Sequence, residues 1–146
     1  MENKNSLKVD LDGLCQAMED NSYEHDYYLD LNNGEILFLS EYIEDDDTKE
    51  QKDQIEDNPD RYELIPKAES REGYEDMVDF IATVTDEHLA ELLEMAVDGK
   101  DAFRRFKDIL SRYPKEQGRW FRFRDDRSVE RALEWLDEIG VALVVE

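Results

Sequence analysis

Two aspartates near the start of the chain are the first residues whose spacing fits a reaction. Asp10 and Asp12 stand two residues apart in the stretch DLDG. In phosphoryl transfer such a pair can act as nucleophile and as acid/base, provided that a hydrophobic strand leads into it. The preceding residues 6–9 (SLKV) make a poor buried strand, and a helical pattern begins at once. We therefore interpret Asp10 or Asp12 as the N-cap of a helix.

Oxygen ligands between residues 30 and 41 are the second candidate, for a calcium site. Asp30, Asn32 and Glu41 fall at positions 1, 3 and 12 of an EF-hand loop. Gly34 occupies position 5 instead of the required position 6, and strand patterns flank the loop where an EF-hand has helices. Asn33-Gly34 between two β-prone runs predicts a hairpin turn instead.

Other ligand types are sparse. Cys15, His25 and His88 occur without a CxxC or HExxH motif, and no spacing places two of them on one face. The run EDDD at 44–47 has no defined geometry and would hold Mg²⁺ or Ca²⁺ only weakly. Cys15 falls on the apolar face of the first helix and is interpreted as a core residue. The sequence predicts no catalytic residues, no metal site and no cofactor.

Positive charge and aromatic rings gather late in the chain. Residues 100–131 contain eleven Lys and Arg against six Asp and Glu, whereas the other 114 residues have a net charge of −27. Arginine beside exposed rings can bind carboxylates and phosphates or stack on bases. We expect a binding surface here, formed by Arg104, Arg105, Lys107, Arg119, Trp120, Arg122, Arg124 and Arg127.

This basic region has four interpretations. Its arginines could pair with the protein's own carboxylates, although exposed pairs contribute only about 0–1 kcal/mol each. They could instead bind an acidic segment of another protein, or nucleic acid. The net charge of −22 opposes nucleic acid, because screening beyond about 8 Å relieves only part of the repulsion. Finally, the acidic part of the chain could imitate nucleic acid toward a basic protein. We expect a non-enzymatic protein-interaction or regulatory module, with nucleic acid as the less favoured ligand.

The composition is typical of a folded protein outside the membrane. Of the 146 residues, 40% are hydrophobic and 10% aromatic, which is enough for a core. The first ten residues lack the apolar run of a secretory signal, and no stretch reaches the roughly 18 apolar residues of a spanning helix. Strong negative charge argues against binding to anionic membranes. With a single cysteine, these features predict a cytoplasmic protein without disulfides.

Alternation and turn residues predict a small antiparallel sheet. The hairpin is expected over 27–39, with strands at 27–31 and 35–39, and a third strand over 61–65 (RYELI) ends at a proline. The β-branched run at 141–145 could return to this sheet. The acidic segment 41–57 is expected to be a mobile loop or a loosely held helix.

Helical periodicity accounts for most of the remaining chain. Four or five helices are expected to cover the sheet in a single α+β domain over residues 1–146. The pattern of the last helix fits a break near 125–128, since earlier rings fall off its apolar face. The expected helical stretches are 11–18, 74–81, about 85–99, 101–113 and 128–139.

Several stretches resemble a known family. Taken in order, YYLDLNNGEI, NPDRYELIP, YEDMVDFI, GKDAFRRFKDIL and RWFRFRDDRSVERALEWLDEIGV resemble a bacterial family of uncharacterised proteins, number 158 in the UPF series. The resemblance covers nearly all of the chain after about residue 7, and it is most specific over 102–108 and over RWFRFRDDR with ALEWL. It implies no activity and no functional residues.

Overall fold

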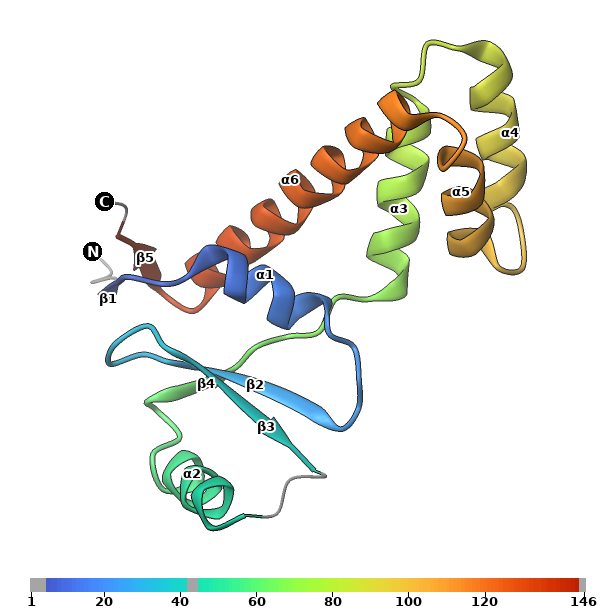
Figure 1. The fold of residues 1–146 in the computed structure, drawn as a ribbon. Coiled ribbons are helices and arrows are strands. Elements are labelled where there is room, and N and C mark those ends of the chain that lie inside the picture. The colour runs from blue at the N-terminus through green and yellow to red at the C-terminus, as the bar shows by residue number, and fades with distance from the viewer. Residues whose placement is uncertain (1–4, 42–44, 145–146) are drawn as a thin grey trace. The chain divides into compact units, whose positions relative to one another are not determined.

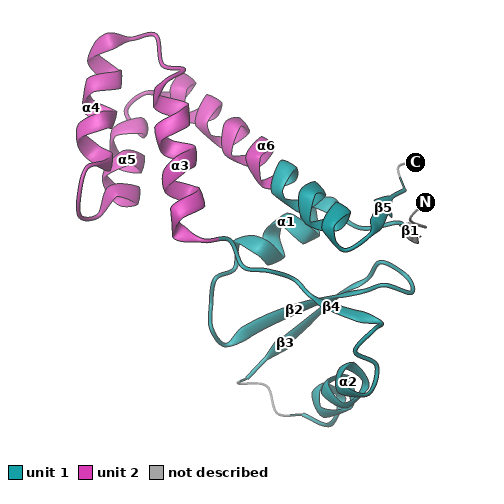
Figure 2. Cartoon of the chain, turned by 180° about the vertical axis from the view of Figure 1, so that it is seen from behind, with its two compact units in different colours: residues 1–68, 129–146 teal, residues 69–128 magenta. Residues whose placement is uncertain are grey.

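The computed structural model describes residues 5–41 and 45–144, which form six helices and five strands (Figure 1). A helix-rich chain with a small antiparallel sheet confirms the expected α+β class. The chain divides into two compact units, which Figure 2 colours separately. Unit 1 comprises residues 1–68 and 129–146, and unit 2 comprises residues 69–128. A single domain over 1–146 stays a prediction.

Three antiparallel strands form the main sheet of unit 1, as the sequence predicts. Their order across the sheet is β3-β2-β4. Asn33-Gly34 lies in the hairpin connection between the first two strands, and the third lies within the expected range 61–65. The bounds are β2 (His25–Asp30), β3 (Ile36–Ser40) and β4 (Tyr62–Leu64).

Gly34 lets the hairpin turn pack closely against the N-terminal segment. Its φ is +81°, in the left-handed region that favours glycine. Its N–H donates to the carbonyl oxygen of Asp30 at 2.8 Å, and the Asn33 side chain accepts from the N–H of Glu35 at 2.9 Å. A Cβ at Gly34 would overlap the carbonyl oxygen of Lys8. Both the backbone conformation and the available space therefore disfavour a side chain here.

Replacing Gly34 tests this packing. Gly34→Ala should lower the free energy of unfolding by about 2 kcal/mol, because strain at positive φ adds to the overlap with Lys8. Gly99→Ala is the matched control: its φ is +96°, but a Cβ there meets nothing within 4 Å, so only about 1 kcal/mol of strain is expected. Urea unfolding of both variants followed by circular dichroism gives the comparison. Equal losses of unfolding free energy in the two variants would show that the close approach of Gly34 to Lys8 does not add to the cost of a side chain at Gly34.

A second, two-stranded sheet joins residues from the start and the end of the chain. β1 (Asn5–Leu7) runs parallel to β5 (Val141–Leu143). The C-terminal strand expected at 141–145 therefore exists but does not join the antiparallel sheet, and residues 145–146 lie outside the described residues. Leu7 and Val9 alternate with polar residues and are buried, which suits a half-buried strand that needs only a partner.

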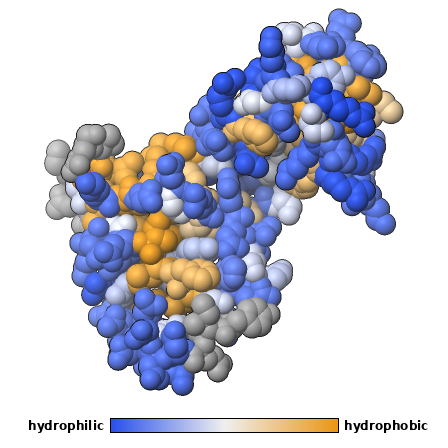
Figure 3. All heavy atoms as spheres, viewed as in Figure 1, coloured by the Kyte–Doolittle hydropathy of each residue, from blue (hydrophilic) through white to orange (hydrophobic). Residues whose placement is uncertain are grey.

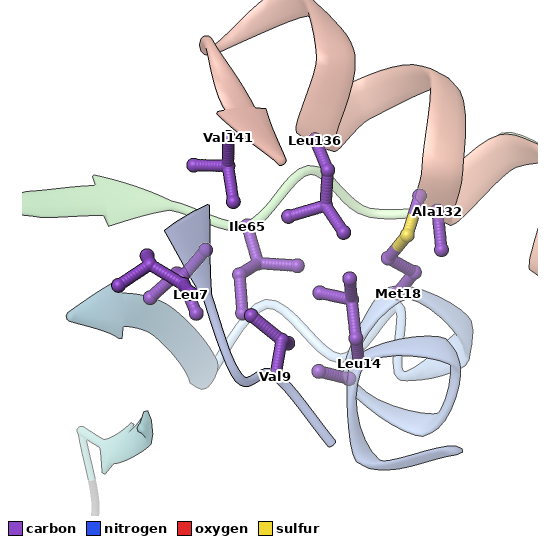
Figure 4. Packing of buried hydrophobic residues seen from close by; sticks show 10 residues of the cluster. Leu7, Val9, Leu14, Met18, Ile65, Ala132, Leu136 and Val141 are labelled. Carbon is purple, nitrogen blue, oxygen red and sulfur yellow. The ribbon is translucent and has the colours of Figure 1, made fainter. Parts of the chain in front are cut away.

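Apolar side chains from the sheet, the short strands and two helices fill the core of unit 1 (Figure 4). α1 (Leu11–Glu19) contributes Leu14, and the C-terminal part of α6 (Pro114–Glu138) contributes Leu136. Neither side chain is more than 1% exposed. Cys15 is partly buried against this cluster, which confirms its expected place on the apolar face of the first helix.

The acidic segment contains a regular helix. α2 (Asp46–Asp57) begins after Asp45, whose side chain accepts a hydrogen bond from the N–H of Thr48 at 2.7 Å. This cap satisfies a free N–H, and no glycine or proline interrupts the helix. With α2, the described residues contain six helices instead of the expected four or five. Residues 42–44 lie outside the described residues, and the mobility of segment 41–57 stays a prediction.

Three helices and the first part of α6 build unit 2. α4 packs against both α3 and α5. Three rings meet edge to face in the core: the centroid of Trp120 lies 4.8 Å from that of Phe106 and 5.4 Å from that of Phe80. None of the three is more than 4% exposed. The bounds are α3 (Ser70–Ile81), α4 (Glu87–Val97) and α5 (Ala102–Leu110).

One continuous helix replaces the break that the sequence predicts near 125–128. No glycine or proline lies between 119 and 138, and Pro114 occupies the first position of α6, where its missing N–H is tolerated. The apolar stripe changes face because Trp120 belongs to the core of unit 2 and Leu136 to the core of unit 1. Neither α6 nor any other helix among the described residues is long and apolar enough to cross a membrane.

Candidate interaction surface

Helix α5 and the first part of α6 carry the residues expected to form a binding surface. Gly99 and Asp101, both with positive φ, turn the chain from α4 into α5. Phe106 and Leu110 then bury one face of α5 in the core of unit 2. The basic residues at 104, 105 and 107 are consequently exposed. Amphipathic spacing alone thus positions these cations.

The Arg105 side chain binds the C-terminal end of α4. Its guanidinium donates to the backbone carbonyl oxygens of Met95 at 3.2 Å, Asp98 at 3.4 Å and Lys100 at 3.5 Å. The last carbonyl groups of a helix have no partner within the helix, and a cation beside them also complements the helix dipole. Arg105 therefore acts as a C-terminal cap of α4.

Arg119 serves the packing of α6 within unit 2. Its guanidinium donates to the Glu116 carboxylate at 2.7 Å and to the Thr83 hydroxyl at 2.6 Å. It also lies over the ring of Phe80, 5.2 Å from the centroid. These contacts tie α6 to the residues that follow α3. Arg119 is thus partnered on several sides by its own unit.

Arg127 is also used by the fold. Its guanidinium donates to the carboxylate of Asp79 at 3.0 Å and lies 4.0 Å from the carboxylate of Asp76, which is only 2% exposed. The same group lies 4.9 Å from the centroid of the Phe123 ring. Because a buried carboxylate requires a nearby cation, Arg127 holds α6 to α3.

Trp120 lies in the core. It is 4% exposed, and its Nε1 atom has no hydrogen-bond partner among the described residues. The Nε atom of Arg124 is likewise buried without a partner there, while its guanidinium lies 5.8 Å from the centroid of the Phe121 ring. A ring buried like that of Trp120 cannot contact a partner protein. The accessible surface is therefore formed without it.

The remaining cations are those that the fold does not use. The side chains of Lys107 and Arg122 are exposed and form no ion pair or hydrogen bond with any residue that the structure describes. The same is true of Arg112 and Lys115, which the prediction did not include. Lys115 and Arg122 stand seven residues apart and so share one side of α6. We call these four residues, with Arg104 and Arg124, the α5–α6 cation surface.

Two large rings accompany this surface. Phe121 on α6 is 44% exposed, and Phe103 on α5 is 43% exposed. The helical wheel places Phe103 with the buried residues, but it lies in the first turn of α5, at the edge of the core. The neighbouring Arg104 has a 74% exposed side chain, whose one ion-pair partner among the described residues is Asp101, at 3.5 Å. Together these groups offer both charge and apolar area to a ligand.

A separate polar cluster in unit 1 centres on Asp20. Its carboxylate accepts hydrogen bonds from the Tyr27 hydroxyl at 2.8 Å and the Ser22 N–H at 3.1 Å, and it lies 2.7 Å from Nδ1 of His25. These contacts, that of Tyr27 first, lower the pKa of Asp20 to about 2. Lys67 donates to the carbonyl oxygens of Asp20 and His25. The cluster therefore holds the connection between α1 and β2.

The residues considered for a calcium loop have another role. Asp30 is 3% exposed, and its carboxylate accepts from Nε and Nη2 of Arg61 at 3.0 and 2.9 Å. It also accepts from the N–H of Asn32 at 2.9 Å. These hydrogen bonds, that of Arg61 first, lower the pKa of Asp30. Among the described residues, no group of three or more His, Cys, Asp or Glu side chains is arranged to hold a metal ion.

The fold and the surface together define a small acidic α+β protein whose helical unit exposes cations and rings. The chain belongs to the uncharacterised protein family UPF0158, whose model matches residues 4–146 and confirms the resemblance noted above. It is 30% identical to a UPF0158 protein of Pseudomonas aeruginosa over 90% of this chain and 83% of that protein. UPF0158 proteins of Chlamydia muridarum and Chlamydia trachomatis are each 31% identical over 91% of this chain. The chain spans about two fifths of the length of these chlamydial relatives. No solved structure matches.

Proposed function

We propose that this chain is a non-enzymatic protein-interaction or regulatory module of the cytoplasm, which binds an acidic segment of another protein through the α5–α6 cation surface. The proposal rests on which basic side chains lack an acidic partner within the described residues. Lys107, Arg112, Lys115 and Arg122 have no partner among the described residues, although the chain contains 40 Asp and Glu. Cations left accessible in so acidic a protein are available to an external carboxylate.

The division of charge favours a protein over nucleic acid as the ligand. Residues 69–128 carry fifteen Asp and Glu against eleven Lys and Arg, whereas the rest of the chain has a net charge of −18. A long polyanion would be repelled by much of the molecule, since its affinity depends on long-range attraction. A short acidic segment needs only the local surface. Exposed Phe121 adds the apolar area that protein interfaces use beside arginine.

A paired capture experiment tests the proposal. Wild-type protein and the Lys107→Glu/Arg122→Glu variant are used as baits in nuclease-treated lysate. We expect wild-type protein to retain partners that the variant loses at least tenfold, because each reversal replaces attraction by repulsion. Lys49→Glu/Lys52→Glu makes the same charge change at exposed positions on α2 and should retain the partners.

The outcomes separate the possible ligands. Recovery of the same proteins by wild type and by the Lys107→Glu/Arg122→Glu variant would refute the proposal. Partners that disappear on nuclease treatment, with binding that falls steeply as salt rises, would show that nucleic acid is the ligand instead. If only the Lys49→Glu/Lys52→Glu control loses the partners, the binding surface lies in unit 1 instead.

A further inference from the structure

A groove in unit 2 lies between the first turns of α3 and α5. Its volume is about 670 Å³, and its lining includes Arg71 and Tyr74 from α3, Phe103 and Arg104 from α5, and Gly99 from the connection between α4 and α5. In Figure 1 these first turns lie at the same end of unit 2, beside the α4–α5 connection. All of these residues belong to a single compact unit, so the groove is a property of unit 2 itself.

The apolar part of the groove is formed by two rings. Tyr74 and Phe103 are each 43% exposed, which is high for large side chains beside a core. Gly73 lies close to the Phe103 ring: a Cβ at Gly73 would lie 2.9 Å from Cε1 of Phe103. The absence of a side chain at Gly73 thus lets Phe103 rest against α3. An apolar or aromatic side chain of a ligand could pack on these rings.

The polar part of the groove favours an anion. The side chains of Arg71 and Arg104 are 82% and 74% exposed, and among the described residues their ion-pair partners are the exposed Glu75 and Asp101 respectively. Such pairs are weak and easily exchanged for a ligand carboxylate. The N-cap residues of α3 and α5, Glu69 and Asp101, make no side-chain cap, so the first N–H groups of both helices remain as donors for a ligand. Because these N-caps and Glu72 in the first turn of α3 are acidic, the positive charge of the groove comes from its arginines. Among the lining residues, Asp101 is the one carboxylate.

We propose that this groove binds an acidic peptide segment that carries one apolar or aromatic residue. The arginines and the two helix N-termini take the carboxylates, and the rings of Tyr74 and Phe103 take the apolar side chain. The inference rests on the proposed function and deepens it, because it places the anchor of the acidic partner in the groove. The same chemistry argues against a bare anion, which would leave both rings uncovered.

A displayed library of octapeptides, each with at least three Asp or Glu and one Phe, Tyr, Trp or Leu, provides the probe. It is selected on full-length wild-type protein, and an enriched peptide is labelled with fluorescein for anisotropy measurements. Arg71→Glu/Arg104→Glu should weaken binding of this peptide at least tenfold, and Phe103→Ala by about tenfold. Replacing the peptide's acids by Asn and Gln should have an effect as large as the arginine reversals.

The matched control is Lys49→Glu/Lys52→Glu, which makes the same charge change at exposed positions on α2, outside the lining of the groove. It should bind the short peptide within about twofold of wild type, since it lacks no groove contact. Failure of the library to enrich acidic peptides, or equal binding by Arg71→Glu/Arg104→Glu, overturns the inference. Neither result changes the interpretation of the capture experiment, which tests the proposed function by itself. Circular dichroism melting of each variant shows whether a lost affinity reflects lost folding.

Discussion

Phe106→Ala should lower the free energy of unfolding by about 4 kcal/mol. Phe106 is fully buried, and its ring meets those of Phe80 and Trp120 edge to face. Truncation removes the transfer free energy of a buried ring and leaves a cavity that stiff aromatic neighbours cannot fill. Unit 2 comprises only residues 69–128, so this loss is a large part of the stability that such a unit can have.

Phe121→Ala is the matched control for Phe106→Ala, because the chemical change is the same at a residue that is 44% exposed. We expect a loss below about 1 kcal/mol there, from reduced contact with the Arg124 guanidinium. Urea unfolding monitored by tryptophan fluorescence measures both, since Trp120 lies beside Phe106. A loss at Phe106 no larger than that at Phe121 would contradict the aromatic core described for unit 2.

Local signals in the sequence predict much of unit 1. The Asn33-Gly34 pair predicts the hairpin from local sequence alone, because Gly34 readily adopts the positive φ that the turn contains. The pairing of β1 with β5 could not be predicted in the same way, because about 135 residues separate Leu7 from Leu143 and no local pattern records the partner. The prediction of a break in α6 was wrong for a related reason. The apolar residues of α6 change face because they pack into two different cores.

The basic region shows the limit of charge patterns. The helix over 102–110 lies within the expected stretch 101–113, whereas residues 114–127 belong to α6 and lie outside the expected helices. Lys107 and Arg122 are exposed. What the spacing does not reveal is which cations the fold uses: Arg105 caps a helix that ends eight residues earlier, and Arg127 meets an aspartate 48 residues away. Arg71 and Tyr74 were missed because they lie outside the basic stretch, and only the packing of α3 brings them to Phe103. In Figure 3 the visible face of unit 2 is mostly hydrophilic, with several hydrophobic residues among the charged ones.

Arg61→Met should lower the free energy of unfolding by about 3 kcal/mol at pH 7. The substitution keeps apolar volume but removes both hydrogen bonds to Asp30, whose side chain is 4% exposed. A carboxylate left buried without its cation is strongly destabilising, although the 39% exposure of Arg61 lets water relieve part of the loss. The Asn32 N–H remains as a donor. Denaturant unfolding of both proteins gives the difference.

The pH dependence of that difference identifies its origin. In the wild type the pKa of Asp30 is lowered, mainly by Arg61, so the pair stabilises the fold above about pH 4 and this contribution is lost as the pH falls through the folded-state pKa. In Arg61→Met, burial should instead raise the pKa of Asp30, so protonation on acidification removes the penalty. The difference in unfolding free energy between the two proteins should therefore become smaller from pH 7 toward pH 3.

Arg71→Met is the control, at an 82% exposed pair with Glu75, and its unfolding free energy should stay within about 0.5 kcal/mol of wild type at both pH values. A gap that stays constant between pH 7 and pH 3 would mean that Arg61 acts through packing, for instance its contact with the ring of Tyr62 at 5.0 Å, and not through the charge of Asp30.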